Sequence, residues 1–307
     1  MHPRNPHREA YDFLRLIQAC PELKPFLRAH PLGGEAVDFA DPEAVKTLNR
    51  ALLKAHYGVE HWDIPAGYLC PPVPSRADYL HHVAELLAVD AGSVPLGPGV
   101  RAIDIGMGAN CIYPILGTRI FGWSFVGSDV DPTAIKWAKQ LLSANSMLTG
   151  KIECRLQPDA RAIFRLVTRA NERFALSLCN PPFHSSSAEA AAGSLRKLRN
   201  LGGGIKPSQP VLNFGGRPNE LWCDGGEVRF IRQMIKESSE NPELCVWFTT
   251  LVSKKGSVAL IERELRRVRP VDVRTLTLFA GQKQSRVLAW TFLTALERRN
   301  RLRSVKS

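Results

Sequence analysis

The feature that most constrains the fold is an alternation of short apolar runs with amphipathic segments after residue 95. The apolar runs have the length of buried strands, and helical patterns separate most of them. Strands that alternate with helices in this way predict an α/β fold, with a doubly wound parallel sheet and helices on both of its faces. The predicted strands are Val100–Ile105, Trp123–Ser128, Ile152–Leu156, Ala175–Cys179, Leu244–Thr250, Val271–Phe279 and Val287–Thr294.

The last two predicted strands differ from the others in their connection. Only Ala280–Arg286 lies between them. A parallel pair needs a crossover of a dozen or more residues, which this connection cannot provide. The sequence therefore predicts that the sheet ends in an antiparallel hairpin.

The part of the chain before residue 95 has a different character. Helical patterns at residues 11–19, 42–56 and 77–89 are separated by proline-rich stretches such as Cys70–Pro74, and a Pro/Gly linker follows at Val94–Gly99. We therefore expect a helical N-terminal accessory region at residues 1–94 and the α/β domain at residues 95–307.

The net charge favours a polyanionic partner. Lys and Arg number 41 against 29 Asp and Glu, which gives +12 and a pI near 9.6. Nucleic acid is the first candidate, and a basic enzyme without such a partner is the alternative. The basic residues gather at residues 4–8, 196–199 and 263–269 and in the tail at Arg298, Arg299, Arg301, Arg303 and Lys306.

Two classes of protein are not indicated. No apolar run approaches the roughly 18 residues that cross a bilayer, and the N-terminus lacks the apolar stretch of a signal peptide. The seven cysteines form no CxxC pair, so neither a zinc site nor a disulfide framework is predicted. We expect a soluble, cytoplasmic, monomeric protein without a metal or a membrane partner.

The first predicted strand runs into a glycine turn. Asp104 is followed by Gly106 and Gly108, and then by a helical pattern. Such glycines let a ligand approach the backbone at a helix N-terminus. Cys111 stands where a dinucleotide fingerprint needs a third glycine, and Asp104 would place a carboxylate beside a pyrophosphate. Both features argue against NAD and for S-adenosylmethionine, with Asp104, Gly106 and Gly108 as binding residues.

The second predicted strand ends in acidic residues. Asp129 lies at its tip, where α/β proteins bind ribose hydroxyls, and is our candidate for the ribose of the ligand. Asp131 precedes Pro132 and is interpreted as a helix N-cap.

The fourth predicted strand ends abruptly in Asn180-Pro-Pro-Phe183. The prolines fix the backbone, so the Asn180 side chain and the Pro181 carbonyl are held at the carboxyl edge of the sheet. These two oxygens can accept both protons of a planar amine and turn its lone pair toward a methyl donor. Phe183 can stack on the base that carries the amine. The alternative is a simple proline-rich turn.

These motifs resemble the amino-methyltransferases of the class I Rossmann-like fold. The run Asp104–Pro114, together with Asn180–Phe183, is similar to the bacterial ribosomal large-subunit adenine-N6 methyltransferase F family. Segments outside the core, at residues 1–5, 38–45, 63–65 and 73–76, are also similar to this family. The resemblance covers nearly the whole chain.

The resemblance implies a seven-stranded, mostly parallel sheet, S-adenosylmethionine as the donor, and one adenine of 23S ribosomal RNA as the acceptor. It implies an N-terminal region that binds RNA and a methyltransferase domain after it. The residues that it implies are Gly106, Gly108 and Asp129 for the donor, Asn180, Pro181 and Phe183 for the adenine, and Arg4, Asn5 and Arg8 for RNA.

Several alternatives stay open. The acceptor could be another RNA, DNA or a protein glutamine, and a chain with this fold could bind RNA without turnover. Residues 184–225 lack a clear period and are interpreted as a substrate loop. Gly225–Glu227 and Lys254–Lys255 match the family without a definite role, and Asp159 could bind the donor adenine or cap a helix.

Overall fold

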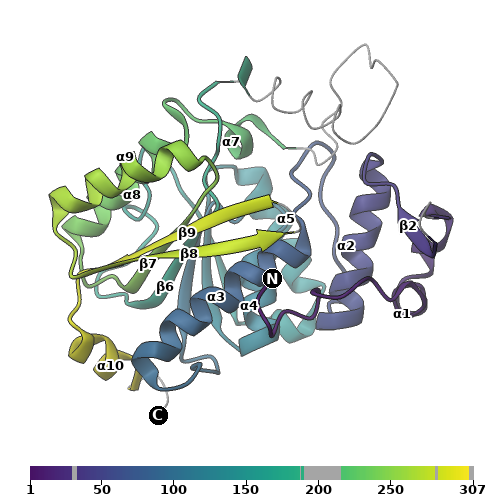
Figure 1. Cartoon of the computed structure of the whole chain (residues 1–307), viewed down its shortest axis with the longest axis horizontal. Helices are drawn as coiled ribbons and strands as arrows, with labels where there is room; N and C mark the ends of the chain where they lie inside the picture. The colour runs from purple at the N-terminus through teal and green to yellow at the C-terminus, as the bar shows by residue number, and fades with distance from the viewer. Residues whose placement is uncertain (30–32, 187, 190–215, 281–282, 304–307) are drawn as a thin grey trace.

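A computed structural model describes residues 1–29, 33–186, 188–189, 216–280 and 283–303 (Figure 1). Within these residues the chain forms a seven-stranded sheet in the order β5-β4-β3-β6-β7-β9-β8 and a separate two-stranded sheet, β1-β2. The strands of the large sheet are β3 (Arg101–Ile105), β4 (Ser124–Asp129), β5 (Ile152–Leu156), β6 (Phe174–Cys179), β7 (Cys245–Val252), β8 (Asp272–Ala280) and β9 (Lys283–Thr291). The predicted seven-stranded Rossmann-like sheet is confirmed.

The sheet is parallel from β5 to β7 and antiparallel beyond it. Strand β9 pairs antiparallel with both β7 and β8, in the register Leu251↔Val287 and Thr275↔Leu288. The predicted C-terminal hairpin is therefore also confirmed. The strand order reverses at β3, which lies between β4 and β6. At such a switch point a crevice opens beyond the carboxyl ends of the strands, and α/β proteins bind their ligands there.

Helices cover both faces of the sheet (Figure 1). The described α-helices are α1 (Phe13–Ala19), α2 (Pro42–Tyr57), α3 (Val73–Ala91), α4 (Ile112–Phe121), α5 (Pro132–Ser143), α7 (Pro218–Leu221), α8 (Gly226–Glu240), α9 (Lys255–Val268) and α10 (Ala295–Arg303). Alternate strand residues face opposite sides. Ala102 therefore belongs to the apolar cluster that includes residues of α2–α5, whereas Ile103 belongs to the cluster that includes residues of α8 and α9.

Helix α3 packs on the sheet although it precedes the Pro/Gly linker. The Tyr79 hydroxyl bonds Thr249 Oγ1 of β7 at 2.7 Å. Asp90, near the end of α3, accepts hydrogen bonds from Trp247 Nε1 at 2.8 Å and from Arg298 Nε at 2.9 Å. One apolar cluster extends from Leu16 to Leu302. The division of function after residue 94 stays a proposal, but the packing continues across it.

Arg298 shows why a count of basic residues can mislead. We interpreted it as part of a basic tail, but its side chain is buried against the Trp247 ring and paired with Asp90. Removal of one partner from a buried ion pair typically costs about 3–5 kcal/mol. Arg298 therefore stabilises the contact between α10 and α3 and does not belong to an exposed basic cluster.

The N-terminal region contains structure that the sequence pattern did not predict. Strands β1 (Leu27–Ala29) and β2 (Glu35–Val37) form the small antiparallel sheet. Helix α3 begins at Val73, inside the proline-rich stretch that we interpreted as a break. Proline is tolerated in the first turn of a helix, where its missing N–H has no partner to lose.

Candidate active site

A cavity lies at the switch point of the sheet, beyond the carboxyl ends of β3, β4 and β6. Its empty space is ≈ 860 Å³ when the open solvent at its mouth is included. Its walls combine the glycine turn, the tip of β4, the loop after β5, the Asn-Pro-Pro segment and α7. Five segments that are far apart in the sequence therefore meet at one site.

The glycine turn folds against the end of β4. The N–H groups of Gly106 and Met107 donate to the Ser128 carbonyl at 2.9 and 3.0 Å, and the Gly108 N–H donates to Asp129 Oδ2 at 2.9 Å. Gly106 and Gly108 have φ of +73° and +65°, a region that glycine enters without strain. The structure thus brings the predicted donor residues Gly106, Gly108 and Asp129 together on the cavity wall.

Asp129 is buried and partly satisfied. Besides the Gly108 N–H, its carboxylate accepts from the Asp131 N–H at 2.9 Å. Burial raises the pKa of Asp129, and the two N–H groups oppose that rise. Each carboxylate oxygen can accept more than one bond, so Asp129 retains capacity for hydroxyl groups. Asp131 is the N-cap of α5 and accepts from the Thr133 N–H, which confirms its predicted role.

Asp104 lies behind the wall rather than on it. Its side chain is fully buried, and neither carboxylate oxygen has a hydrogen-bond partner among the described residues. Burial raises its pKa well above the usual range, and the nearby Asp129 carboxylate adds to the rise, whereas Arg76 opposes it. Asp104 is absent from the cavity lining. Its role in donor binding stays a prediction, and the structure places its side chain outside the residues that line the cavity.

The Asn-Pro-Pro segment forms the opposite wall. Asn180, Pro181 and Pro182 line the cavity, and Asn180 Oδ1 is buried without a hydrogen-bond partner in the described part of the chain. A buried acceptor without a hydrogen-bond partner costs about 1–3 kcal/mol. Unpaired acceptors on a cavity wall are therefore typical of ligand-binding sites. Phe183 is half-buried and does not line the cavity.

The chain beyond Phe183 is tied to the segment that contains α7. The His184 N–H donates to the Leu221 carbonyl, and the Cys223 N–H donates to the His184 carbonyl, both at 3.1 Å. Most of the predicted substrate loop, residues 187 and 190–215, lies outside the described residues. The two hydrogen bonds join the described ends of this loop, at His184 and at Leu221–Cys223, beside the cavity.

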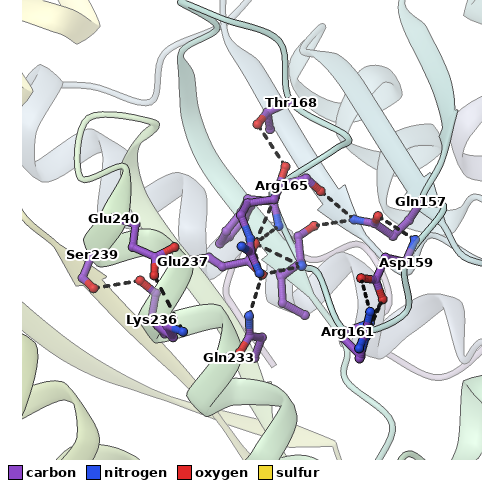
Figure 2. Close-up of polar contacts among 12 residues, drawn as sticks. Gln157, Asp159, Arg161, Arg165, Thr168, Gln233, Lys236, Glu237, Ser239 and Glu240 are labelled. Carbon is purple, nitrogen blue, oxygen red and sulfur yellow. Dashed lines mark hydrogen bonds and ion pairs between the residues drawn. The ribbon is translucent and has the colours of Figure 1, made fainter.

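The loop after β5 forms a third wall, and one buried carboxylate from α8 holds it. Glu237 accepts from the N–H groups of Ile163, Phe164 and Arg165 at 2.7–3.1 Å (Figure 2). Gln157 Nε2 donates to the Arg165 carbonyl at 2.9 Å. These bonds fix the backbone that brings Gln157 and Ile163 to the cavity wall.

Asp159 is on this loop but faces away from the cavity. Its carboxylate accepts from the Arg161 N–H and pairs with the Arg161 guanidinium at 3.0 Å (Figure 2). It neither lines the cavity nor begins a described helix. Gln157, two residues earlier, is the polar side chain of this loop that reaches the wall.

Two charged wall residues were missed by the sequence reasoning. Arg76, on α3, is the one cationic side chain among the described residues that line the cavity, and it lies 5.5 Å from the centre of the Tyr113 ring. Glu220, on α7, reaches the wall from the other side. For Arg76 the signal was the resemblance of residues 73–76 to the family, which carried no role. For Glu220 it was the interpretation of residues 184–225 as a substrate loop, which singled out no residue.

The predicted RNA-binding residues of the N-terminal arm separate into two groups. Arg4 and Arg8 are exposed, and Arg4 pairs with Glu85 at 2.6 Å. Asn5 is buried, with its amide nitrogen donating to the Pro74 carbonyl at 3.0 Å and to Asp78 at 3.2 Å. The Asn5 side chain therefore anchors the arm on α3 and is not accessible to RNA.

The family-like segment at residues 225–227 also has a structural explanation. Glu227 is buried and accepts from the Ser253 N–H at 2.8 Å and from the Lys254 N–H at 3.3 Å. It thereby fixes the turn between β7 and α9. The Lys254 ammonium pairs with Glu189 at 2.6 Å. The structure does not place Lys255 in the cavity lining.

No helix in the described parts of the chain is long and apolar enough to cross a bilayer. No cluster of three or more His, Cys, Asp or Glu side chains in those ranges could hold a metal ion.

Comparison with known sequences finds RNA methyltransferases. A family model described as "RNA methyltransferase" matches residues 1–294. The curated protein "Ribosomal RNA large subunit methyltransferase F" of Photobacterium profundum is 52% identical, with 96% of this chain and 92% of that protein covered. The protein of the same name from Aeromonas salmonicida is 54% identical, with 95% of this chain and 91% of that protein covered.

Solved structures with the same architecture include human METTL16. The METTL16 catalytic domain in complex with an RNA hairpin of the MAT2A 3'UTR is 30% identical, with a TM-score of 0.78 over 96% of this chain and 98% of that chain. The N-terminal domain of human METTL16 in complex with SAH is 28% identical, with a TM-score of 0.75 over 96% and 99% of the two chains. The similarity extends through the N-terminal region as well as the sheet.

Proposed function

This chain belongs to the RNA methyltransferase family and is a methyltransferase that uses S-adenosylmethionine, and we propose that its acceptor is the N6 amine of one adenine in 23S ribosomal RNA. Relatives at about half identity carry a name that specifies large-subunit ribosomal RNA. The observation that carries the adenine assignment is the unpaired, buried Asn180 Oδ1 beside Pro181 in the cavity.

The residues present fit the donor. S-adenosylmethionine supplies a methyl group on a sulfonium, and it carries a ribose, a carboxylate and an ammonium. Asp129 offers acceptors for the ribose hydroxyls, and Arg76 offers a guanidinium for the carboxylate. The left-handed turn at Gly106 and Gly108 lets the donor approach the backbone closely.

Asn180 and Pro181 act on the amine of the base. The Asn180 side-chain oxygen and the Pro181 carbonyl accept its two N–H groups, so the nitrogen lone pair is held toward the methyl group. No strong base is needed, because the nitrogen loses its proton after it attacks. Phe183 stacks on the base, which must leave its RNA context to enter the cavity.

The exposed basic residues support an RNA acceptor. Arg4 and Arg8 lie on the arm that Asn5 fixes to α3. Phosphate contacts from such residues position RNA without reading its sequence. A protein glutamine would gain nothing from them, and DNA is disfavoured by the names of the relatives.

The test is methyl transfer from labelled S-adenosylmethionine to total RNA from a strain that lacks this chain. We expect label in 23S RNA, and hydrolysis to nucleosides should recover it as N6-methyladenosine at one position. RNA from the parental strain, already methylated, is the matched control and should accept little label. Label in DNA, protein or another base would overturn the proposal.

A further inference from the structure

We propose that Glu220 recognises the α-ammonium group of the donor and so makes the enzyme selective for donors that carry this amine. The inference rests on the proposed function in one respect, because it assumes that S-adenosylmethionine occupies the cavity at the switch point. It assigns a partner to a carboxylate that belongs to none of the motifs described above.

Glu220 lies close to the glycine turn. A Cβ atom built on Gly108 would lie 3.3 Å from Glu220 Oε1 and 3.0 Å from Asn110 Nδ2. Glu220 and Asn110 both line the cavity. The carboxylate oxygen therefore lies beside the turn over which a donor must pass.

One oxygen of Glu220 is held in place. Glu220 Oε2 accepts from the Arg217 N–H at 2.8 Å and from the Leu69 N–H at 3.0 Å. Two backbone segments thus fix the orientation of the carboxylate, and Oε1 is the oxygen on the side of Gly108. A carboxylate fixed before the ligand arrives loses little conformational entropy on binding.

The charges on the wall assign the ammonium to this residue. Among the described residues, the carboxylates that line the cavity are Asp129 and Glu220, and Arg76 is the cation. Asp129 already accepts two backbone N–H groups and is proposed to bind the ribose. Arg76 complements the donor carboxylate. Asp104 lies behind the wall, so Glu220 is the carboxylate left to accept from the ammonium.

The surroundings of Glu220 favour a cationic ligand. Burial raises its pKa, and the carboxylates of Asp129 and Asp131 add to that rise, whereas the N–H groups of Arg217 and Leu69 oppose it. The Glu220 side chain therefore lies at a negative potential, which a cationic ligand would offset. Hydrogen bonds between ionised partners in such a setting are about twice as strong as neutral ones.

This contact also connects the donor to the base clamp. Helix α7 is followed at once by the bonds that join Leu221 and Cys223 to His184, the residue after Phe183. A donor that binds Glu220 stabilises α7, and α7 stabilises the chain beyond Phe183. The donor thereby helps to order the residues that receive the adenine.

The experiment measures binding by calorimetry on the full chain, with two ligands. One is S-adenosylhomocysteine, and the other is the same molecule with hydrogen in place of the α-amino group. Glu220→Gln is the test variant, because its amide oxygen can still accept from Arg217 and Leu69. Asp224→Asn is the matched control: the same chemical change, three residues beyond α7 at an exposed carboxylate outside the cavity lining.

We expect wild type and Asp224→Asn to bind S-adenosylhomocysteine about tenfold to a hundredfold more tightly than the ligand without the amine. Glu220→Gln should lose that preference, through weaker binding of S-adenosylhomocysteine alone. Equal weakening for both ligands would show that Glu220 only holds the segment, and no change for either would remove it from the site. A wild type that binds neither ligand would instead refute the proposed donor.

Discussion

The most informative single change is Asn180→Ala, because the structure predicts a large loss of catalytic rate without a loss of stability. Asn180 Oδ1 is buried and unpaired in the described chain, so the folded protein bears the cost of an unsatisfied acceptor. Alanine removes that acceptor. The backbone at this position, between the end of β6 and the two prolines, stays unchanged. The variant should therefore fold normally.

The two magnitudes follow from this geometry. An unsatisfied buried acceptor costs about 1–3 kcal/mol, which offsets the packing lost with a small side chain. We expect the free energy of unfolding to stay within about 1 kcal/mol of wild type, or to rise. In the chemical step, loss of one of two acceptors lets the amine move, and a displacement of about 1 Å can cost on the order of a hundredfold in rate.

The assay is the single-turnover rate of methyl transfer to unmethylated 23S RNA, with donor affinity and urea unfolding measured on the same preparations. Asn219→Ala is the matched control, since Asn219 also lines the cavity but lies outside the Asn-Pro-Pro segment. Donor affinity should be nearly unchanged in Asn180→Ala. A parental rate in this variant would refute the proposed mechanism, and a large loss of stability would refute the interpretation of Asn180 Oδ1 as an atom kept for the ligand.

Three further predictions concern the donor, the RNA and the pH dependence of stability. Asp129→Ala should weaken donor binding, since hydrogen bonds to a charged acceptor contribute about 1.5–3 kcal/mol each; unchanged affinity in calorimetry would exclude Asp129 from the site. Replacement of Arg4 and Arg8 by Ala should reduce the salt dependence of RNA binding and leave donor binding unaltered; an unchanged slope would show that the arm makes no phosphate contact. Burial lowers the pKa of His81 to about 4, below its unfolded value of 6.5, so its contribution to stability is complete above 6.5 and is lost as pH falls toward 4. His81→Phe should reduce the loss of urea stability between pH 7 and pH 5, to which His7, whose pKa burial also lowers to about 4, still contributes. An unaltered pH profile would contradict this.

The parts of the fold that follow from local pattern were predicted from the sequence. All seven strands of the large sheet lie within a few residues of the predicted runs. The central parallel strands β3, β4 and β6 were the most visible in the sequence, because buried parallel strands are short and mostly apolar. The hairpin followed from the length of one connection. Strands β1 and β2 are three residues each, too short to show a period, and were missed.

Helix α3 shows what a local pattern could not reveal. Its residues 77–89 were predicted to be helical, but the Pro/Gly linker after it suggested a boundary. Across this linker α3 packs on the sheet through buried polar bonds from Tyr79 and Asp90. Those partners are on β7, more than 150 residues away in sequence, so no local rule could have placed them.

The same distinction explains which site residues were predicted. Gly106 and Asn180 each follow a strand directly and Asp129 is the last residue of one, and the carboxyl ends of parallel strands must meet at one edge. Their proximity follows from the topology alone. Arg76 is within a helix and Glu220 within a single helical turn, and neither follows a strand.

What brings Arg76 and Glu220 to the cavity is packing at both of its ends. Helix α3 lies on the sheet and carries Arg76 inward, while the N–H groups of Leu69 and Arg217 turn Glu220 toward the glycine turn. The strand ends thus supply Asp129 for the ribose of the donor and Asn180 for the amine of the adenine. The packed segments supply charges for the two ends of the donor's amino acid, which decide which donor is accepted. Selectivity for the donor therefore depends on tertiary contacts that a motif does not contain, and a variant such as Glu220→Gln can change it while every motif stays intact.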